Sequence, residues 1–197
     1  MFKQRTDKRV AAFLADGCEE VEALAVVDVL FRMGIPVDTV AVADDGGSAI
    51  VSSHQIRITC DRRVQDLDFA GYDLLFLPGG MPGTNNLAAC DVLCRHVDEF
   101  AAPDSGKCVA AICAAPGVVL ARRGLLRGRK ATANPNFQHE IAQNGGTAVA
   151  DQRVVQDGNV FTSQGMGTAT DLGLALVGHY LGQEAVEEAK QKIVYWG

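Results

Sequence analysis

The sequence has no long uninterrupted hydrophobic run and no excess of positive charge. Charged residues at Glu22, Asp28 and Arg32 interrupt its most apolar segment, so no stretch reaches the roughly 20 apolar residues of a membrane span. The formal net charge is −6, which argues against a surface that binds nucleic acid. We therefore expect neither a membrane nor a nucleic acid among its partners.

Signals for secretion and for a metal-bound scaffold are also missing. Basic residues within 3–9 precede an apolar run that ends at Asp16, which is too short for a signal peptide. The six cysteines lack the spacing of a disulfide framework, so we expect reduced thiols in the cytoplasm. Cys90 and Cys94 lie one helical turn apart, but no nearby histidine completes a ligand set, and no metal is expected. The histidines, at positions 54, 96, 139 and 179, are interpreted as structural or surface residues.

The sequence does contain a regular alternation of short apolar runs and longer helical segments. Its 197 residues carry no internal repeat, low-complexity tract or linker, so we expect one domain over residues 1–197. The alternation predicts an α/β fold with a mostly parallel sheet and helices on both faces. The expected strands are 9–15, 37–43, two short strands in 49–60, 73–77, 108–112, 130–133 and a hairpin in 153–163; the expected helices are 20–33, 85–102 (one or two), 114–123, 136–144, 169–181 and 184–195; and a turn is expected at 44–48.

One segment joins a strand to a helix with no turn residue between them. The helix that follows strand 108–112 has Pro116 in its first turn, where the missing N–H costs nothing. Cys113 stands at the junction, which resembles a nucleophile elbow that holds one side chain at the top of the sheet. Unpaired N–H groups and the helix dipole would favour a reactive thiolate there. The pattern equally suits a small core residue, because free cysteine is among the most buried residue types.

Three loops leave the carboxyl ends of predicted strands, which is where open α/β sheets bind ligands. They are residues 16–19, residues 78–83 and the elbow at Cys113. Gly79 and Gly80 could let backbone N–H groups approach an oxyanion, since glycine allows a close approach of the backbone. The alternative is a tight turn after a strand.

Glu22 is the candidate partner of Cys113. It shares a helix face with apolar residues, and the charged form of a carboxyl group is disfavoured in such surroundings. It could hold its proton and donate a hydrogen bond to a thiolate, or act as a general acid/base. The alternative is a solvated glutamate that interacts favourably with the helix dipole. Asp28 and Arg32, four residues apart, are expected to form an ion pair on the helix surface.

Four motifs, taken together and in this order, resemble those of the ThiJ/PfpI superfamily. They are DGCEEVE at 16–22, LPGG at 77–80, AAICAAP at 110–116 and TSQGMGT at 162–168. The similarity covers nearly the whole chain and is nearest to the branch of the parkinsonism-associated protein deglycase and its bacterial chaperone-like relative YajL. It implies a flavodoxin-like three-layer sandwich and a homodimer. It also implies that Cys113 is the reactive, peroxide-sensitive cysteine, that Glu22 hydrogen-bonds it, and that Gly79 and Gly80 form part of an oxyanion pocket.

Several positions near the implied site distinguish branches of the superfamily. Arg32 matches an arginine on the dimer-interface side of the pocket. Ala114 stands where the protease-like branch has histidine and the isonitrile-hydratase branch has threonine, so the chain is expected not to be a peptidase. Asn134 replaces a histidine that the deglycase has near the site, Gln55 replaces a second pocket arginine, and Met166 replaces a proline.

Cys18 is a further departure, because alanine is common at its position in that branch. It lies in a loop beside the predicted site. We hypothesise that Cys18 resolves oxidised Cys113 as a disulfide, since resolving thiols lie near reactive ones. The alternative is a small loop residue without a redox role.

Two functions are compatible with these residues. In the first, a cofactor-independent glyoxalase or deglycase, the Cys113 thiolate adds to methylglyoxal or to its adducts on proteins and metabolites. Glu22 then moves the proton, and Gly79 and Gly80 stabilise the alkoxide. In the second, the protein is not an enzyme; Cys113 stops at sulfinic acid, and the oxidised dimer acts as a redox sensor or chaperone in oxidative stress. A binding module that keeps the pocket without turnover is a third alternative.

Overall fold

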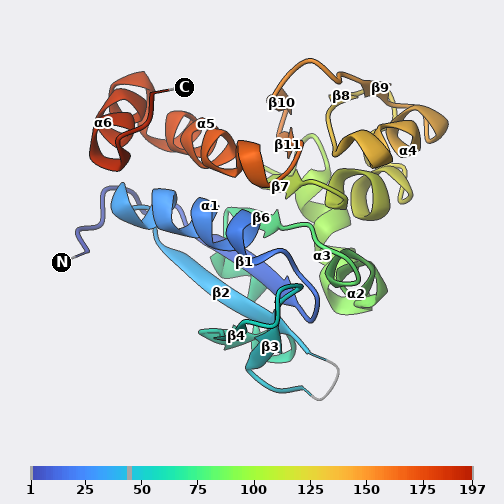
Figure 1. Cartoon of the computed structure of the whole chain (residues 1–197), viewed down its shortest axis with the longest axis horizontal. Coiled ribbons are helices and arrows are strands. Elements are labelled where there is room, and N and C mark those ends of the chain that lie inside the picture. Colours follow the sequence, from blue (N-terminus) through green and yellow to red (C-terminus); the bar gives the residue numbers. More distant parts are fainter. Residues whose placement is uncertain (1, 44–45, 197) are drawn as a thin grey trace.

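The chain is organised around a seven-stranded sheet, with residues 2–43 and 46–196 described in the computed structural model (Figure 1). The strand order is β10-β11-β7-β6-β1-β2-β5. Every neighbouring pair is parallel except β10 and β11, which form an antiparallel hairpin. The strands are β1 (Val10–Ala15), β2 (Val37–Val42), β5 (Arg62–Arg63), β6 (Leu74–Leu77), β7 (Cys108–Ile112), β10 (Val154–Asp157) and β11 (Val160–Ser163).

Two small sheets lie outside the central one. The antiparallel pair of β3 (Ala49–Val51) and β4 (Arg57–Thr59) forms the hairpin expected within residues 49–60. The parallel pair of β8 (Lys130–Ala131) and β9 (Thr147–Ala148) flanks the segment that contains α4 (Gln138–Gln143).

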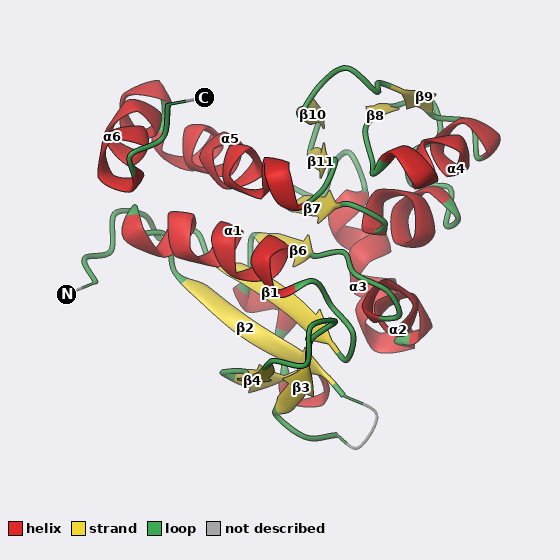
Figure 2. Cartoon of the chain, viewed as in Figure 1, coloured by secondary structure: helices red, strands yellow, loops and turns green. Residues whose placement is uncertain are grey.

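Helices cover both faces of the central sheet (Figure 2). Alternate residues of each strand face opposite sides, so Val10, Ala12 and Leu14 of β1 belong to one apolar core, whereas Ala11, Phe13 and Ala15 belong to the other. The first core is completed by α1 (Glu20–Arg32), α5 (Ala169–Leu181) and α6 (Gln183–Ile193); the second by α2 (Gly83–Ala89), α3 (Asp91–Ala101), η3 (Pro116–Ala121) and α4. The expected three-layer sandwich with a mostly parallel sheet is therefore confirmed.

Short elements account for most differences from the prediction. Strands β5 and β9 have two residues each, which is too short for a hydrophobic pattern to reveal. The predicted segment 85–102 is two helices that meet at Cys90. Single 3₁₀ turns, which were not predicted, occur as η1 (Val64–Asp66), η2 (Phe69–Gly71), η4 (Pro135–Phe137) and η5 (Met166–Thr168).

The α-helix predicted for residues 114–123 is wrong in type. The structure has a π-helix, η3, in which the N–H of Arg122 donates to the carbonyl of Gly117 at 3.2 Å. All six residues of η3 are buried, so no polar stripe marks the number of residues per turn in the sequence.

The remaining boundaries shift by one or a few residues. The last helix ends at Ile193, because Val194 is left-handed with a φ of 55°. Part of the turn predicted at 44–48, namely residues 44 and 45, lies outside the described residues. None of the helices in the described ranges is long and apolar enough to cross a lipid bilayer.

Candidate functional site

Four loops meet at one edge of the central sheet. The strands β11, β7, β6 and β1 are adjacent and parallel, so their carboxyl ends lie side by side. Three of the loops, at 16–19, at 78–83 and at Cys113, are those expected from the sequence. The fourth, residues 164–168, follows β11 and was marked only by its motif.

Cys113 adopts the backbone conformation of an elbow. Its φ is 65°, in the left-handed region that non-glycine residues rarely occupy. Two hydrogen bonds from neighbouring segments hold it there: its N–H donates to the Ser163 carbonyl at 3.0 Å, and the Asn134 N–H donates to its carbonyl at 2.9 Å. Its side chain is half-buried and packs against the first apolar core, so the thiol keeps partial access to solvent.

Glu22 is buried against Cys113. Its exposed fraction is 2%, and its Oε2 accepts a hydrogen bond from the Gly79 N–H at 2.9 Å. The Met166 N–H also stabilises its carboxylate, and so does a hydrogen bond from the Cys113 thiol. The alternative of a solvated glutamate is therefore excluded. Sequence reasoning did not assign the Met166 N–H a role, because backbone donors leave no mark on residue type.

Gly79 provides the space in which Cys113 and Glu22 meet. A Cβ at this position would stand 2.5 Å from the Cys113 Cβ and 2.5 Å from the Glu22 Oε2. The two glycines also have different roles, whereas the sequence suggested one. The Gly79 N–H is taken by Glu22, and the amides that stabilise the Cys113 sulfur are those of Gly80 and Ala114.

Burial dominates the electrostatics of the pair. Burial raises the pKa of Glu22 to about 7, although the hydrogen bond from Cys113 acts in the opposite direction. Burial also raises the pKa of the Cys113 thiol to about 12, and the negative charge of Glu22 adds to this effect. This differs from the expectation that the helix terminus alone would favour the thiolate. Because two adjacent negative charges are disfavoured, the residues titrate as a pair; while Glu22 holds its proton, the repulsion on the sulfur is absent.

Asn134 and Ala114 lie at the pair, as expected. The Asn134 Nδ2 and the Glu22 Oε1 are each 3.7 Å from the point where a Cβ on Gly165 would stand. The Asn134 Oδ1 accepts a hydrogen bond from the Asn136 N–H at 3.1 Å, which orients its amide group. Ala114 is 1% exposed and contributes its backbone rather than its side chain.

Arg32 lies away from the pair within this chain. It is ten residues beyond Glu22 on α1, about 15 Å along the helix axis. Its Nε donates to the Asp28 Oδ2 at 2.6 Å, which confirms the predicted surface ion pair. It borders a hollow that also contains Phe2 and Phe31. A role for Arg32 beside Cys113 stays a prediction. Such a role would require the Arg32 of a partner chain to approach the pair.

Cys18 is fully buried, and burial raises the pKa of its thiol to about 12. The charged groups that act most strongly on this thiol are Cys60 and Glu20. The strongest neighbours of Cys113 are instead Glu22 and the amides of Gly80 and Ala114. A resolving role for Cys18 stays a prediction. All six cysteines are free.

Comparison with known proteins identifies relatives over most of the chain. A family model described as "DJ-1/PfpI family" matches residues 8–179. "Protein DJ-1 homolog A" of Arabidopsis thaliana is 36% identical over 181 residues, and the chain spans 92% of its own length but only 45% of that relative. The "Glutathione-independent glyoxalase DJ-1" of Schizosaccharomyces pombe is 30% identical, with 95% of this chain and 96% of that protein covered. Among solved structures, "Toxoplasma gondii DJ-1, oxidized" has a TM-score of 0.88 and 29% identity, and covers 96% of this chain and 100% of that one.

Replacement of Gly79 by alanine is expected to separate Cys113 from Glu22. The added methyl group overlaps both side chains, so we expect a loss of about 1–3 kcal/mol in the free energy of unfolding and slower alkylation of Cys113. Gly71→Ala is the matched control, because no atom of the described residues lies within 4 Å of its added Cβ. Urea denaturation and iodoacetamide labelling measure the two effects. If the two variants had the same free energy of unfolding and the same rate of Cys113 alkylation, the close contact of Gly79 with Cys113 and Glu22 would be contradicted.

The pH dependence of stability is expected to report the buried carboxyl group. The pKa of Glu22 rises from 4.5 to about 7 on folding, so its contribution to stability is complete below pH 4.5 and is lost as the pH rises through 7. Relative to Glu22→Gln, the wild-type free energy of unfolding should fall by about 3 kcal/mol between pH 4 and pH 8. Denaturation of both proteins across this range measures the difference. A difference that is constant with pH would show that Glu22 titrates normally.

Proposed function

Since this chain belongs to the DJ-1/PfpI family, we propose that it is a cofactor-independent enzyme of carbonyl stress that converts methylglyoxal or its adducts. The observation that carries the proposal is the half-buried Cys113, held in a strained elbow directly against the buried Glu22. A relative that is similar over nearly its whole length is named a glutathione-independent glyoxalase, which supports this reaction class.

The first step is addition of the Cys113 thiolate to the aldehyde carbon. The Cys113 thiol gives its proton to the Glu22 carboxylate as the carbon–sulfur bond forms. The carbonyl electron pair moves to oxygen, and the alkoxide then takes that proton from Glu22. The amides of Gly80 and Ala114 stabilise negative charge on the sulfur, which supports a role for them in stabilising the developing charge on the neighbouring oxygen.

The next steps convert the adduct into an acid. The Glu22 carboxylate removes the hydrogen on the former aldehyde carbon as a proton and returns it to the neighbouring carbon. The proton on the oxygen of the former aldehyde moves to the oxygen of the neighbouring carbon, which leaves a thioester of a 2-hydroxy acid on Cys113. Water then cleaves the thioester, releasing the acid and the thiol. The reaction consumes one water and has no net oxidation, so it requires no electron acceptor. For an adduct, Cys113 instead displaces the amine or thiol: the new carbon–sulfur bond replaces the bond to that group, which leaves with the proton that Glu22 received from the Cys113 thiol.

Glu22 carries all of these proton transfers because the neighbouring Asn134 amide cannot titrate. The raised pKa of Glu22, about 7, suits a group that must both give and take a proton near neutral pH. Ala114 in place of a histidine directly after the nucleophile supports a function other than peptidase.

A second candidate function is a redox sensor or chaperone. Cys113 is half-buried, whereas Cys18, Cys60, Cys94 and Cys108 are buried, so peroxide has better access to Cys113 than to those four thiols. The Gly80 and Ala114 amides would hold the oxygens of a sulfinate. The solved relative from Toxoplasma gondii is described as oxidized, which supports the proposal that proteins with this fold can exist in an oxidized form. Six free thiols suit a reducing compartment such as the cytoplasm.

We also infer that the chain forms a homodimer through α1. Three large apolar side chains on this helix are exposed: Val21 at 45%, Leu24 at 39% and Phe31 at 47%. Covering such side chains is a common reason for association between copies of one chain. A partner packed there would also bring a second Arg32 to the interface.

Methylglyoxal consumption by the reduced protein without glutathione tests the proposed reaction. Wild type is expected to form a 2-hydroxy acid, and Cys113→Ser should lower the rate at least about 10³-fold, because the nucleophile is lost. Cys90→Ser is the matched control, since Cys90 is also a half-buried free thiol and should keep the wild-type rate. No turnover by wild type would contradict the proposed enzymatic function and favour the redox function.

Sedimentation velocity tests the dimer. Wild type is expected to sediment as a dimer, and Phe31→Glu as a monomer, because a charge on α1 opposes burial of this face. Val194→Glu changes another exposed apolar side chain, 65% exposed and beyond the last helix, and should leave the dimer intact. A wild-type monomer at micromolar concentration would contradict the inference.

A further inference from the structure

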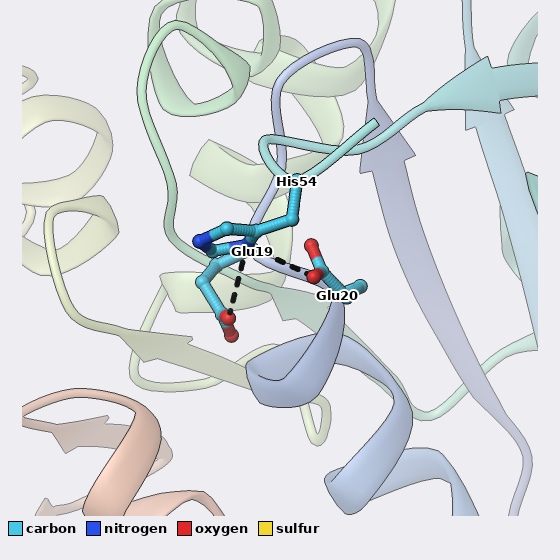
Figure 3. A group of neighbouring side chains, drawn as sticks. All are labelled: Glu19, Glu20 and His54. Atoms are coloured by element: carbon cyan, nitrogen blue, oxygen red, sulfur yellow. Dashed lines mark ion pairs between the residues drawn. The ribbon is translucent and has the colours of Figure 1, made fainter. Parts of the chain in front are cut away.

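Three ligand-type side chains converge at the start of α1, outside the Cys113–Glu22 pair (Figure 3). His54 comes from the turn between β3 and β4, and Glu19 and Glu20 from the end of the loop after β1 and the first position of α1. The His54 Nδ1 lies 2.9 Å from the Glu20 Oε1 and 3.9 Å from the Glu19 Oε1. One ligand atom from each of the three lies within 4.8 Å of the other two.

Glu20 is a buried carboxylate whose second oxygen is unpaired among the residues that the structure describes. The residue is 7% exposed, and its Oε2 is enclosed without a hydrogen-bond partner in residues 2–43 and 46–196. The Ser52 hydroxyl acts on this carboxylate, yet no donor of the described part of the chain reaches Oε2 in hydrogen-bonding geometry. Figure 3 shows the carboxylate turned toward the imidazole of His54. An unpaired buried carboxylate oxygen costs free energy unless a cation compensates it.

Capping of α1 explains only part of this arrangement. The Glu19 Oε2 accepts a hydrogen bond from the Glu22 N–H at 2.6 Å, which accounts for a carboxylate at the helix start. It does not account for the second carboxylate at Glu20 or for an imidazole facing both. An ion pair with protonated His54 would be weak, because that side chain is 66% exposed.

We propose that Glu19, Glu20 and His54 bind a divalent transition-metal cation, for which Zn²⁺ is the best fit. Two carboxylate oxygens and an imidazole nitrogen are ligands of zinc, whereas magnesium prefers oxygen ligands alone. Two ligands of one tetrahedral zinc stand about 3.3 Å apart, and the observed distances of 2.9 and 3.9 Å from the His54 Nδ1 lie on either side of this value. The two carboxylates balance the charge of the ion, and the exposed side leaves the fourth position to water.

The proposed site is distinct from the Cys113–Glu22 pair and does not rest on the proposed function. It shares one connection with the pair: Glu19 would bind the ion through Oε1 while its Oε2 keeps the bond to the Glu22 N–H. The bound ion would join the β3–β4 turn to the start of α1. The expectation of no metal from the sequence rested on cysteine spacing, and His54, which lies 34 residues from Glu20, was interpreted as a structural or surface residue.

Zinc titration of metal-free protein by calorimetry tests the proposal, with Cys113→Ser as the parent so that the reactive thiol cannot bind the ion. The parent is expected to bind about one Zn²⁺ per chain. His54→Ala and Glu20→Gln should each weaken binding at least about tenfold, because loss even of a group that only supports a metal ligand has an effect of this size. His139→Ala is the matched control, since His139 is exposed and stands 3.8 Å from a single carboxylate of Glu140; it should leave binding unchanged.

Two further measurements separate metal binding at this site from loss of folding and from binding by thiols. Circular dichroism of metal-free His54→Ala should match that of the parent, because the side chain is exposed. The Co²⁺-loaded parent should show no thiolate-to-metal charge-transfer band, since no cysteine is among the proposed ligands. Absence of zinc binding, equal affinity of His54→Ala and its parent, equal weakening by His139→Ala, or a thiolate band would each overturn the proposal.

Discussion

One buried carboxyl group organises the carboxyl edge of the sheet. The side chain of Glu22 extends from α1 to the point where the loops after β6, β7 and β11 meet. Its carboxyl group interacts with the Gly79 amide, the Cys113 thiol and the Met166 amide. Each of these interactions joins a different loop to the same side chain. Burial of Glu22 therefore fixes the relative positions of segments that are up to 144 residues apart in the sequence. The charge of this group also controls the charge that the neighbouring sulfur can carry.

Much of the fold could be predicted because the strands are apolar on both faces. The runs at β1, β6 and β7 are fully buried, so their pattern does not depend on the details of packing. The hairpin at Asp157 and Gly158 was predictable from its turn residues. The two-residue strands and the π-helix were not, because their form is decided by tertiary contacts. Gly117 illustrates this: a Cβ there would stand 3.1 Å from the Cβ of Phe137, which lies 20 residues away.

The site was predictable in its side chains and less so in its backbone. Cys113 and Glu22 carry recognisable chemistry, and the structure brings them together. The donors that surround them are amides of Gly79, Gly80, Ala114 and Met166, whose direction depends on loop conformation rather than on residue type. The same limitation hid His54, because its proximity to Glu20 arises only when the β3–β4 turn folds over the start of α1.

The backbone around Cys113 and Glu22 leaves no room for larger side chains. Gly79 admits no side chain, Gly80 has a φ of 89° and would place a Cβ 2.3 Å from the Glu19 nitrogen, and Ala114 is enclosed by the fold. Any adaptation of this site to molecules of different size must therefore come from residues that are less enclosed. Met166, 58% exposed, is a residue whose side chain can change without disturbing these enclosed positions, because its interaction with the Glu22 carboxylate comes from its backbone amide. Relatives with different substrate selectivity would therefore be expected to differ in the loop after β11, while Cys113 and Glu22 stay the same.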